Sequence, residues 1–176
     1  TYHGDNHVDP DSIDLCKHPV YHRLPQMSWD ELWMRPVDVQ ISTGIDVYRE
    51  WFAMMVDDLL NTDPSIPIVA ESAAFLPKNV SKVLSNDSNA VFLTSTEEFL
   101  RSHYPDRVEL LDHALKGCKD PKAAFDNWMN RDAGIAKWIA QQAVEHSCRH
   151  IVVDGSRSID DTAMDIAAHF RLALHI

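Results

Sequence analysis

The sequence predicts an α/β fold built around a parallel sheet. Three short apolar runs are continuous rather than alternating: IPIVA at 66–70, AVFL at 90–93 and HIVV at 150–153. Continuous apolar runs are typical of strands that are covered on both faces, as in a parallel sheet. Long stretches with apolar residues at helical spacing separate the three runs. Strands that alternate with helices indicate the α/β class.

The first helical patterns lie between residues 27 and 60. Ser28 is a predicted N-cap, because Glu31 follows three residues later as in a capping box, with Met27 and Leu32 placed as a hydrophobic staple. A longer helix follows. Its apolar residues recur at helical spacing, and they are Ile45, Tyr48, Phe52, Met55 and Leu59.

Further helices are predicted after the second and third runs. Ser95 and Glu98 repeat the capping pattern directly after residues 90–93. A helix marked by Ile135, Ile139 and Ala143 is expected to end near Ser147. The last helix is capped by Ser158 with Asp161, and its expected apolar face is Ile159, Ala163, Ile166, Phe170 and Leu174. Residues 103–134 have no strand pattern and are rich in charge, which predicts a helical excursion or lid.

The composition narrows the class of protein. A chain of 176 residues with 45% hydrophobic residues fits one globular domain. The formal net charge of −11 argues against a general nucleic-acid or anionic-membrane surface. The three cysteines have no CxxC spacing, which favours a reducing cytoplasm over a disulfide framework. No apolar run approaches the ~18 residues of a membrane span, and the start lacks the pattern of a signal peptide.

Candidate functional residues follow the apolar runs. In open parallel sheets, ligands bind beyond the carboxyl ends of the strands. The residues at those ends are Glu71 and Ser72, then Thr94 and Ser95, then Asp154, Gly155, Ser156 and Arg157. If Tyr2 and His3 finish a strand, Asp5 and Asn6 join the same edge. The edge then gathers carboxylates, hydroxyls and an arginine, a combination whose spacing alone does not name a reaction.

Five segments, in their order, resemble small P-loop kinase-like proteins related to the nucleoside-monophosphate and shikimate kinases. They are YHGDNHV, IPIVAESAAFLP, NAVFLTSTEEF, NWMNRDAGIAKWI and IVVDGSRSIDDTAMDIAAHF. The likeness covers residue 2 to about residue 170, and VDGSRSIDD is its most specific piece. It implies a single domain over 1–176, with a three-layer parallel sheet flanked by helices and a helical lid at about 101–134.

One family motif is missing from these 176 residues. The family's G-x-x-x-x-G-K-S/T loop follows a strand that would come before Tyr2, so the resemblance implies that this strand and its loop precede Thr1. The family usually has two consecutive acidic residues at this position. Here the GDN segment has Asp5 as the first, and Asn6 replaces the second.

The resemblance implies an ATP- or GTP-dependent kinase that phosphorylates a small molecule with the help of Mg²⁺. It places Asp5 where a carboxylate binds or deprotonates the acceptor hydroxyl. Glu71 stands where an acid supports Mg²⁺ through water, so neither carboxylate is expected to bind the metal directly. Arg131 resembles the lid arginine that closes on the phosphates.

The resemblance also implies binding residues. DGSRS looks like the turn under the adenine ring, which makes Gly155, Ser156 and Arg157 candidates for nucleotide binding. Arg35 and Arg49 are candidates for gripping an anionic acceptor, and Trp29, Trp33, Trp51 and Phe52 hint at an aromatic-lined pocket. No nucleic-acid or membrane partner is expected, and the oligomeric state is left open.

Each candidate also has a purely structural interpretation. Asp5 could be a turn or cap residue, and Arg131 could pair with Asp132 or Asp126 on a solvated helix. Arg157, Arg35 and Arg49 could be ordinary structural arginines.

Two other functions also remain open. One is a nucleotide-binding or structural module without turnover. The other is a metal-dependent phosphoesterase that uses His3, Asp5, His7 and Glu71. Gly4 and the residues that follow it disfavour a helix that would bring His3 and His7 together. Pro19 likewise separates His18 from His22.

Overall fold

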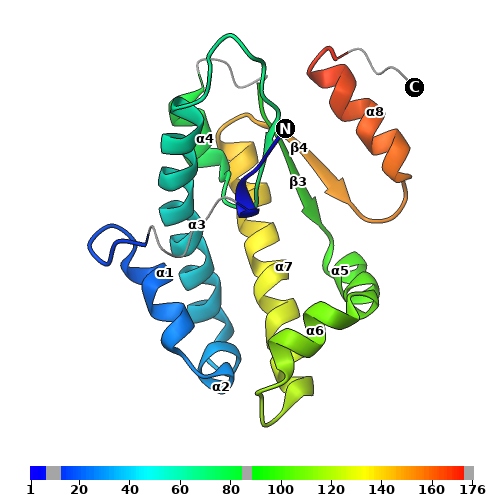
Figure 1. The fold of residues 1–176 in the computed structure, drawn as a ribbon. Helices are drawn as coiled ribbons and strands as arrows, with labels where there is room; N and C mark the ends of the chain where they lie inside the picture. Colours follow the sequence, from blue (N-terminus) through cyan, green and yellow to red (C-terminus); the bar gives the residue numbers. More distant parts are fainter. Residues whose placement is uncertain (7–12, 85–88, 173–176) are drawn as a thin grey trace.

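A computed structural model describes residues 1–6, 13–84 and 89–172, and its fold is mixed α/β with 62% helix (Figure 1). Strand β1 (Tyr2–His3) pairs in parallel with β2 (Ala70–Glu71), and β3 (Val91–Ser95) pairs in parallel with β4 (Arg149–Val153). The predicted mixed class and the parallel pairing are therefore confirmed. Over the described residues the strands form two separate two-stranded sheets, not one continuous sheet.

The predicted strand at 66–70 is mostly wrong, whereas those at 90–93 and 150–153 are confirmed within β3 and β4. Of residues 66–70, only Ala70 lies in a strand, and Ile66 and Val69 are exposed at 61% and 51%. Two features explain the short strand. Its partner β1 is two residues long, and Pro67 has no backbone N–H to donate to a ladder.

Helices supply most of the structure. In chain order they are α1 (Pro19–Arg23), α2 (Trp29–Trp33), α3 (Val37–Leu60), α4 (Pro77–Val83), α5 (Glu97–His103), α6 (Val108–Leu115), α7 (Pro121–Glu145) and α8 (Ile159–His169). The 3₁₀ turns within the described ranges are η1 (Gly4–Asn6), η3 (Leu24–Gln26) and η5 (Tyr104–Asp106). Among the described residues, no helix is both long and apolar enough to cross a membrane.

Two predicted helix caps are confirmed. The Ser28 hydroxyl accepts a hydrogen bond from the Glu31 amide at 3.2 Å, and the Glu31 carboxylate accepts one from the Ser28 amide at 2.9 Å. This reciprocal pair is the capping box that starts α2. The Ser158 hydroxyl accepts from the Asp161 amide at 3.0 Å and caps the start of α8.

The predicted cap at Ser95 is wrong by one residue. The Thr96 hydroxyl accepts from the Phe99 amide at 3.2 Å, because Ser95 is still the last residue of β3.

The predicted apolar face of α8 is also wrong in part. Ile159 is 88% exposed and Ala167 is the buried residue of the helix, whereas Leu174 lies outside the described residues.

Helices α3 and α7 run side by side through the middle of the molecule (Figure 1). Two glycines allow this close approach. A Cβ atom added to Gly134 would lie 2.3 Å from Ile41 Cδ1, and one added to Gly44 would lie 2.9 Å from Ile135 Cδ1. Ile45, Leu76 and Ile135 form a buried cluster at this contact. The crossing therefore fixes how residues of α3 face residues of α7.

The span predicted as a helical lid is helical, with α6 and the first half of α7 as its main elements. It packs against α2 through a buried cluster of Trp33, Ala114, Ala124, Trp128 and Met129. The Trp33 indole donates a hydrogen bond to the Ala114 carbonyl at 3.0 Å, which ties α2 to α6. Whether this span moves over a ligand stays a prediction.

Candidate functional site

The ends of β1 and β2 bring predicted site residues together. The two strands run parallel, so the residues that follow them meet at one end of the pair. The Ser72 hydroxyl donates to Asp5 Oδ1 at 2.6 Å, and His3 Nδ1 lies 2.8 Å from Glu71 Oε1. We call these four residues, His3, Asp5, Glu71 and Ser72, the strand-end group. The side chains of His3 and Glu71 are 55% and 63% exposed, so the group faces solvent.

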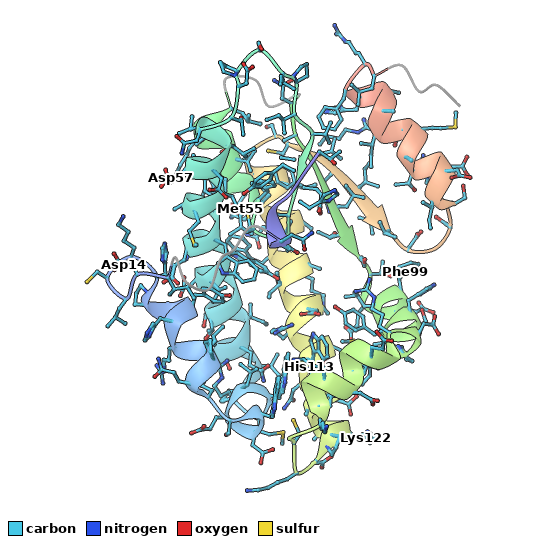
Figure 2. All side chains as sticks on the ribbon, in the orientation of Figure 1. Asp14, Met55, Asp57, Phe99, His113 and Lys122 are labelled. Atoms are coloured by element: carbon cyan, nitrogen blue, oxygen red, sulfur yellow. The ribbon has the colours of Figure 1, made fainter. Side chains whose placement is uncertain are left out.

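Gly4 is what allows η1 to hold Asp5 in this place. A Cβ atom on Gly4 would lie 2.7 Å from Met55 Sδ and 2.8 Å from Ser72 Cβ. Figure 2 labels Met55 on α3 beside the turn. A side chain at residue 4 would push η1 away from both α3 and β2, and Asp5 would move with it.

The carboxylates of Asp5 and Glu71 suit Mg²⁺ chemically, because that ion prefers oxygen donors and keeps several waters. Each carboxylate already accepts from a different neighbour, Ser72 or His3, and contact through water remains compatible with this arrangement. Within the described ranges, no three His, Cys, Asp or Glu side chains converge as metal ligands. His7, from the phosphoesterase set, lies outside those ranges.

Arg131 lies in a half-buried aromatic setting on α7. Its guanidinium pairs with Asp132 at 2.7 Å and lies 4.8 Å from the centre of the Trp33 ring. The Tyr104 hydroxyl donates to the other oxygen of Asp132 at 2.9 Å. The ion pair between Arg131 and Asp132, which the structural interpretation of Arg131 predicts, is therefore present. The helix face is not simply solvated, because the Arg131 side chain is 24% exposed.

Tyr48 of α3 links Arg131 to the strand-end group. Burial raises the pKa of its phenol most, the Arg131 cation opposes this rise, and the Asp132 and Asp5 carboxylates add to it. These charges reach Tyr48 from two different elements, since Asp5 belongs to η1 and the Arg131–Asp132 pair to α7. The structure thus brings Asp5 and Arg131 to the neighbourhood of one tyrosine.

Arg35 lies in the connection between α2 and α3. Its Nε donates to the Leu32 carbonyl at 3.4 Å and its Nη1 to the Thr43 hydroxyl at 3.3 Å, both of them long bonds. Burial lowers the pKa of its guanidinium most, and the positive charges of Arg23 and Arg131 lower it further. The predicted acceptor-binding residue Arg35 is therefore an electrostatic neighbour of the predicted lid residue Arg131.

Arg49 has partners of its own on the helices. Its guanidinium pairs with Asp46 at 2.7 Å and lies 5.9 Å from the centre of the Trp138 ring. These contacts fit the structural interpretation of Arg49, and its role in binding an acceptor stays a prediction.

The predicted nucleotide turn after β4 is formed and exposed. Asp154 Oδ1 accepts from the Ser156 amide at 2.9 Å and from the Ser156 hydroxyl at 2.6 Å, and these bonds hold the pKa of Asp154 low. Gly155 has φ of +84°, a value that favours glycine, and a Cβ there would lie 3.3 Å from the Phe99 ring.

Arg157 is held against α8. Its Nη1 lies 3.0 Å from Asp165 Oδ2, and its Nη2 donates to the Asp161 carbonyl at 3.0 Å. The turn that carries Gly155, Ser156 and Arg157 thus belongs to the β3–β4 sheet and α8, whereas the strand-end group belongs to the β1–β2 sheet. Binding of a nucleotide by this turn stays a prediction.

Two further histidines have separate environments. His18 is buried at 7% exposure, and its Nδ1 accepts from the Asp14 amide at 3.1 Å. His22 Nδ1 instead lies 2.9 Å from the Gln26 amide nitrogen. The two rings therefore do not share a ligand position.

Sequence reasoning missed several residues of this region. Tyr48 was read only as part of an apolar helix face, and Arg23, Thr43 and Tyr104 were not singled out. Trp33 was noted as a pocket residue, but not as the surface beneath Arg131. A hydroxyl-bearing side chain on an otherwise apolar helix face is the signal that the sequence offers for Tyr48.

The chain was compared with protein-family models, with curated proteins and with solved structures, and none of them matches it. The kinase resemblance therefore rests on the quoted sequence segments alone.

Proposed function

We propose that this protein is a P-loop-type small-molecule kinase that transfers a phosphoryl group from ATP or GTP to an acceptor bound between the strand-end group and Arg131. One observation carries the proposal. Asp5, just after β1, and Arg131, on α7, both act electrostatically on Tyr48, a partly buried tyrosine that packs against the cluster of Tyr2, Met55 and Ala74. Phosphoryl transfer needs a group that orients the acceptor hydroxyl and cations that neutralise the transferred phosphate, and these two residues supply both.

The proposal assigns a role to each residue. Asp5 would accept the hydrogen bond of the acceptor hydroxyl in place of the one from Ser72, and would take its proton as transfer proceeds. Arg131 would place its positive charge beside the transferred group. Glu71 would hold the waters of Mg²⁺, whose charge offsets that of the triphosphate. Gly155, Ser156 and Arg157 would lie under the base.

The proposal also includes one continuous parallel sheet with helices on both faces. Strands of parallel sheets are normally covered on both sides, yet Leu93 of β3 and Val152 of β4 are 45% and 52% exposed. A strand that carries the glycine-rich loop and lies between β2 and β3 would join the two sheets. Such a strand would place its loop near Glu71 and the turn at Gly155.

The proposal is tested by phosphoryl transfer in the protein that carries this chain. The protein is incubated with MgATP or MgGTP and a panel of hydroxyl-bearing metabolites, and the products are followed by phosphorus NMR. Asp5→Asn should lower turnover by about 100-fold or more, because a positioned general base contributes that much. Asp57→Asn, on the exposed side of α3, is the matched control and should leave turnover unchanged.

The outcomes separate the three functions. Nucleotide binding without transfer to any acceptor would favour a module without turnover. Phosphate release from phosphoesters that depends on added metal, and not on a nucleotide, would favour the phosphoesterase. Turnover that is equal in Asp5→Asn and in the native protein would refute the role given to Asp5.

A further inference from the structure

The start of α2 is attached to residues 116–120, which we call the α6–α7 connection. The Trp29 ring lies against Gly117, since a Cβ atom added to this glycine would lie 2.0 Å from Trp29 Cδ1. Asp30 Oδ1 accepts a hydrogen bond from the Lys119 amide at 2.9 Å, and Asp30 Oδ2 lies 3.6 Å from Lys119 Nζ. We call these four residues, Trp29, Asp30, Gly117 and Lys119, the α2 latch.

The end of α2 is attached to α3 and α7 instead. Gln40 of α3 is 2% exposed, and its side-chain amide donates to the Trp33 carbonyl at 3.0 Å and to the Arg35 carbonyl at 2.8 Å. The Asn127 side chain of α7 also donates to the Trp33 carbonyl, at 3.0 Å. The Trp33 ring stacks on Trp128 with 4.9 Å between the ring centres. Helix α2 is therefore held on α3 at one end and contacts the α6–α7 connection at the other.

The contacts at the two ends of α2 differ in how far they are exposed to solvent. Trp33 is 6% exposed, whereas the side chains of Asp30 and Lys119 are 27% and 93% exposed. Trp29 is only partly buried. Local opening of a folded protein begins where few apolar contacts are buried and the hydrogen bonds reach solvent. The contacts of the α2 latch should therefore break before those of Trp33.

We propose that the α2 latch holds the α6–α7 connection closed, and that the connection opens when Trp29 and Asp30 release it while α2 stays attached to α3. The contacts of the latch are made between residues of the chain, so the latch itself needs no ligand to close. The frequency of opening at the tip of the predicted lid is then set by α2, a helix that lies outside the lid. This inference does not depend on the proposed function.

Amide hydrogen exchange at Lys119 measures the opening of the latch, and NMR follows it in the whole protein. Asp30→Ala should speed this exchange about tenfold or more, because the hydrogen bond to a charged group is lost. Asp30→Asn should speed it less, since an amide oxygen can still accept the bond. Asp63→Ala is the matched control, because Asp63 Oδ1 also accepts from a backbone amide, that of Ser65 at 2.9 Å, in the segment after α3. Exchange at Lys119 should be unchanged in this control.

Gly117→Ala tests the latch without a change of charge. The new methyl would lie 2.0–2.9 Å from three atoms of the Trp29 ring, so the ring must move away from the connection. Exchange at the Lys119 amide should again become faster than in the native protein.

A thiol reagent gives a second measure of opening at Cys118. This cysteine belongs to the connection and is partly buried against the cluster that contains Trp33, whereas Cys16 is exposed. Cys118 should react faster in Gly117→Ala than in the native protein, and Cys16 should react equally in both. The Asp30 variants do not suit this measurement. Burial raises the pKa of the Cys118 thiol most and the Asp30 carboxylate adds to the rise, so removing that carboxylate makes the thiol more reactive by itself.

Two other amides separate release of the latch from wider unfolding. The Met34 amide donates to the Asp30 carbonyl at 2.8 Å within α2, and the Ile45 amide lies in the buried contact of α3 with α7. Exchange at both should change far less than exchange at Lys119. An equal increase at Met34 would show that α2 is released as a whole, an equal increase at Ile45 would show unfolding of the protein, and either result overturns the proposal.

Equal exchange at Lys119 in Asp30→Ala and Asp63→Ala would also overturn it. The experiment uses neither nucleotide nor acceptor, so such a result would leave the kinase proposal untouched. Conversely, the absence of phosphoryl transfer would leave the latch standing.

Discussion

Replacing Gly134 by alanine should destabilise the protein, although alanine is the better helix former. The new methyl would lie 2.3 Å from Ile41 Cδ1 and 2.9 Å from Ile41 Cγ1, across the contact between α7 and α3. Both atoms belong to one side chain. Removing that side chain should therefore remove the clash.

The expected size follows from two opposing terms. Alanine in place of glycine inside a helix contributes up to about 1 kcal/mol of stability. Overpacking a close contact costs about 1–3 kcal/mol, since Ile41 must leave its preferred rotamer or the helices must separate. The net loss for Gly134→Ala is then about 0–2.5 kcal/mol. In an Ile41→Ala background both clashing atoms are gone, so the same change should stabilise the protein by about 0.5–1 kcal/mol.

Urea unfolding, monitored by circular dichroism, measures this cycle. The native protein, Gly134→Ala, Ile41→Ala and the double variant give a coupling energy that should be about 1–3 kcal/mol. Gly44→Ala is the matched control on α3. Its new methyl meets Ile135 Cδ1 at 2.9 Å, at the flexible end of a side chain, so its loss should be smaller.

The change of sign between the two backgrounds is the decisive result. Two results would show that Ile41 of α3 does not pack closely against Gly134 of α7. One is that Gly134→Ala stabilises the native protein, and the other is a coupling energy below about 0.5 kcal/mol.

Three further predictions concern the caps, the sheets and η1. Ser28→Ala should lower the free energy of unfolding in urea by about 1 kcal/mol through loss of the capping box, and an unchanged midpoint would contradict this. His150 lies in β4, and burial lowers its pKa, so its contribution to stability is present above about pH 6.5 and is lost as the pH falls below that value. His150→Gln should therefore flatten the loss of thermal stability between about pH 7 and 5, and an equal slope in both proteins would refute the assignment. Gly4→Ala should cost about 1–3 kcal/mol in urea unfolding, because its methyl meets Met55, and a loss-free variant would show that η1 does not pack as described.

Local signals in the sequence were enough for much of the fold. The helix caps at Ser28 and Ser158 are found where the spacing predicted them, because a cap depends on residues within one helical turn. The apolar runs at 90–93 and 150–153 form strands that pair in parallel with each other, although Leu93 and Val152 remain 45% and 52% exposed. The run at 66–70 had the same composition and failed, because a strand also requires a neighbour whose backbone can pair with it.

In the candidate site, too, some features follow from short sequence segments and others only from the tertiary structure. The sequence predicted that Asp5 and Glu71 stand at the ends of strands, and the parallel pairing of β1 with β2 brings the two strand ends together. Only the tertiary structure decided that Arg131 lies over Trp33 and that Arg35 lacks a carboxylate among the described residues. The first fact depends on the packing of α2 against α7, which joins residues that are about a hundred positions apart. The burial and the electrostatic surroundings of a side chain at such a contact depend on several helices together. The spacing of residues within one segment therefore does not predict them.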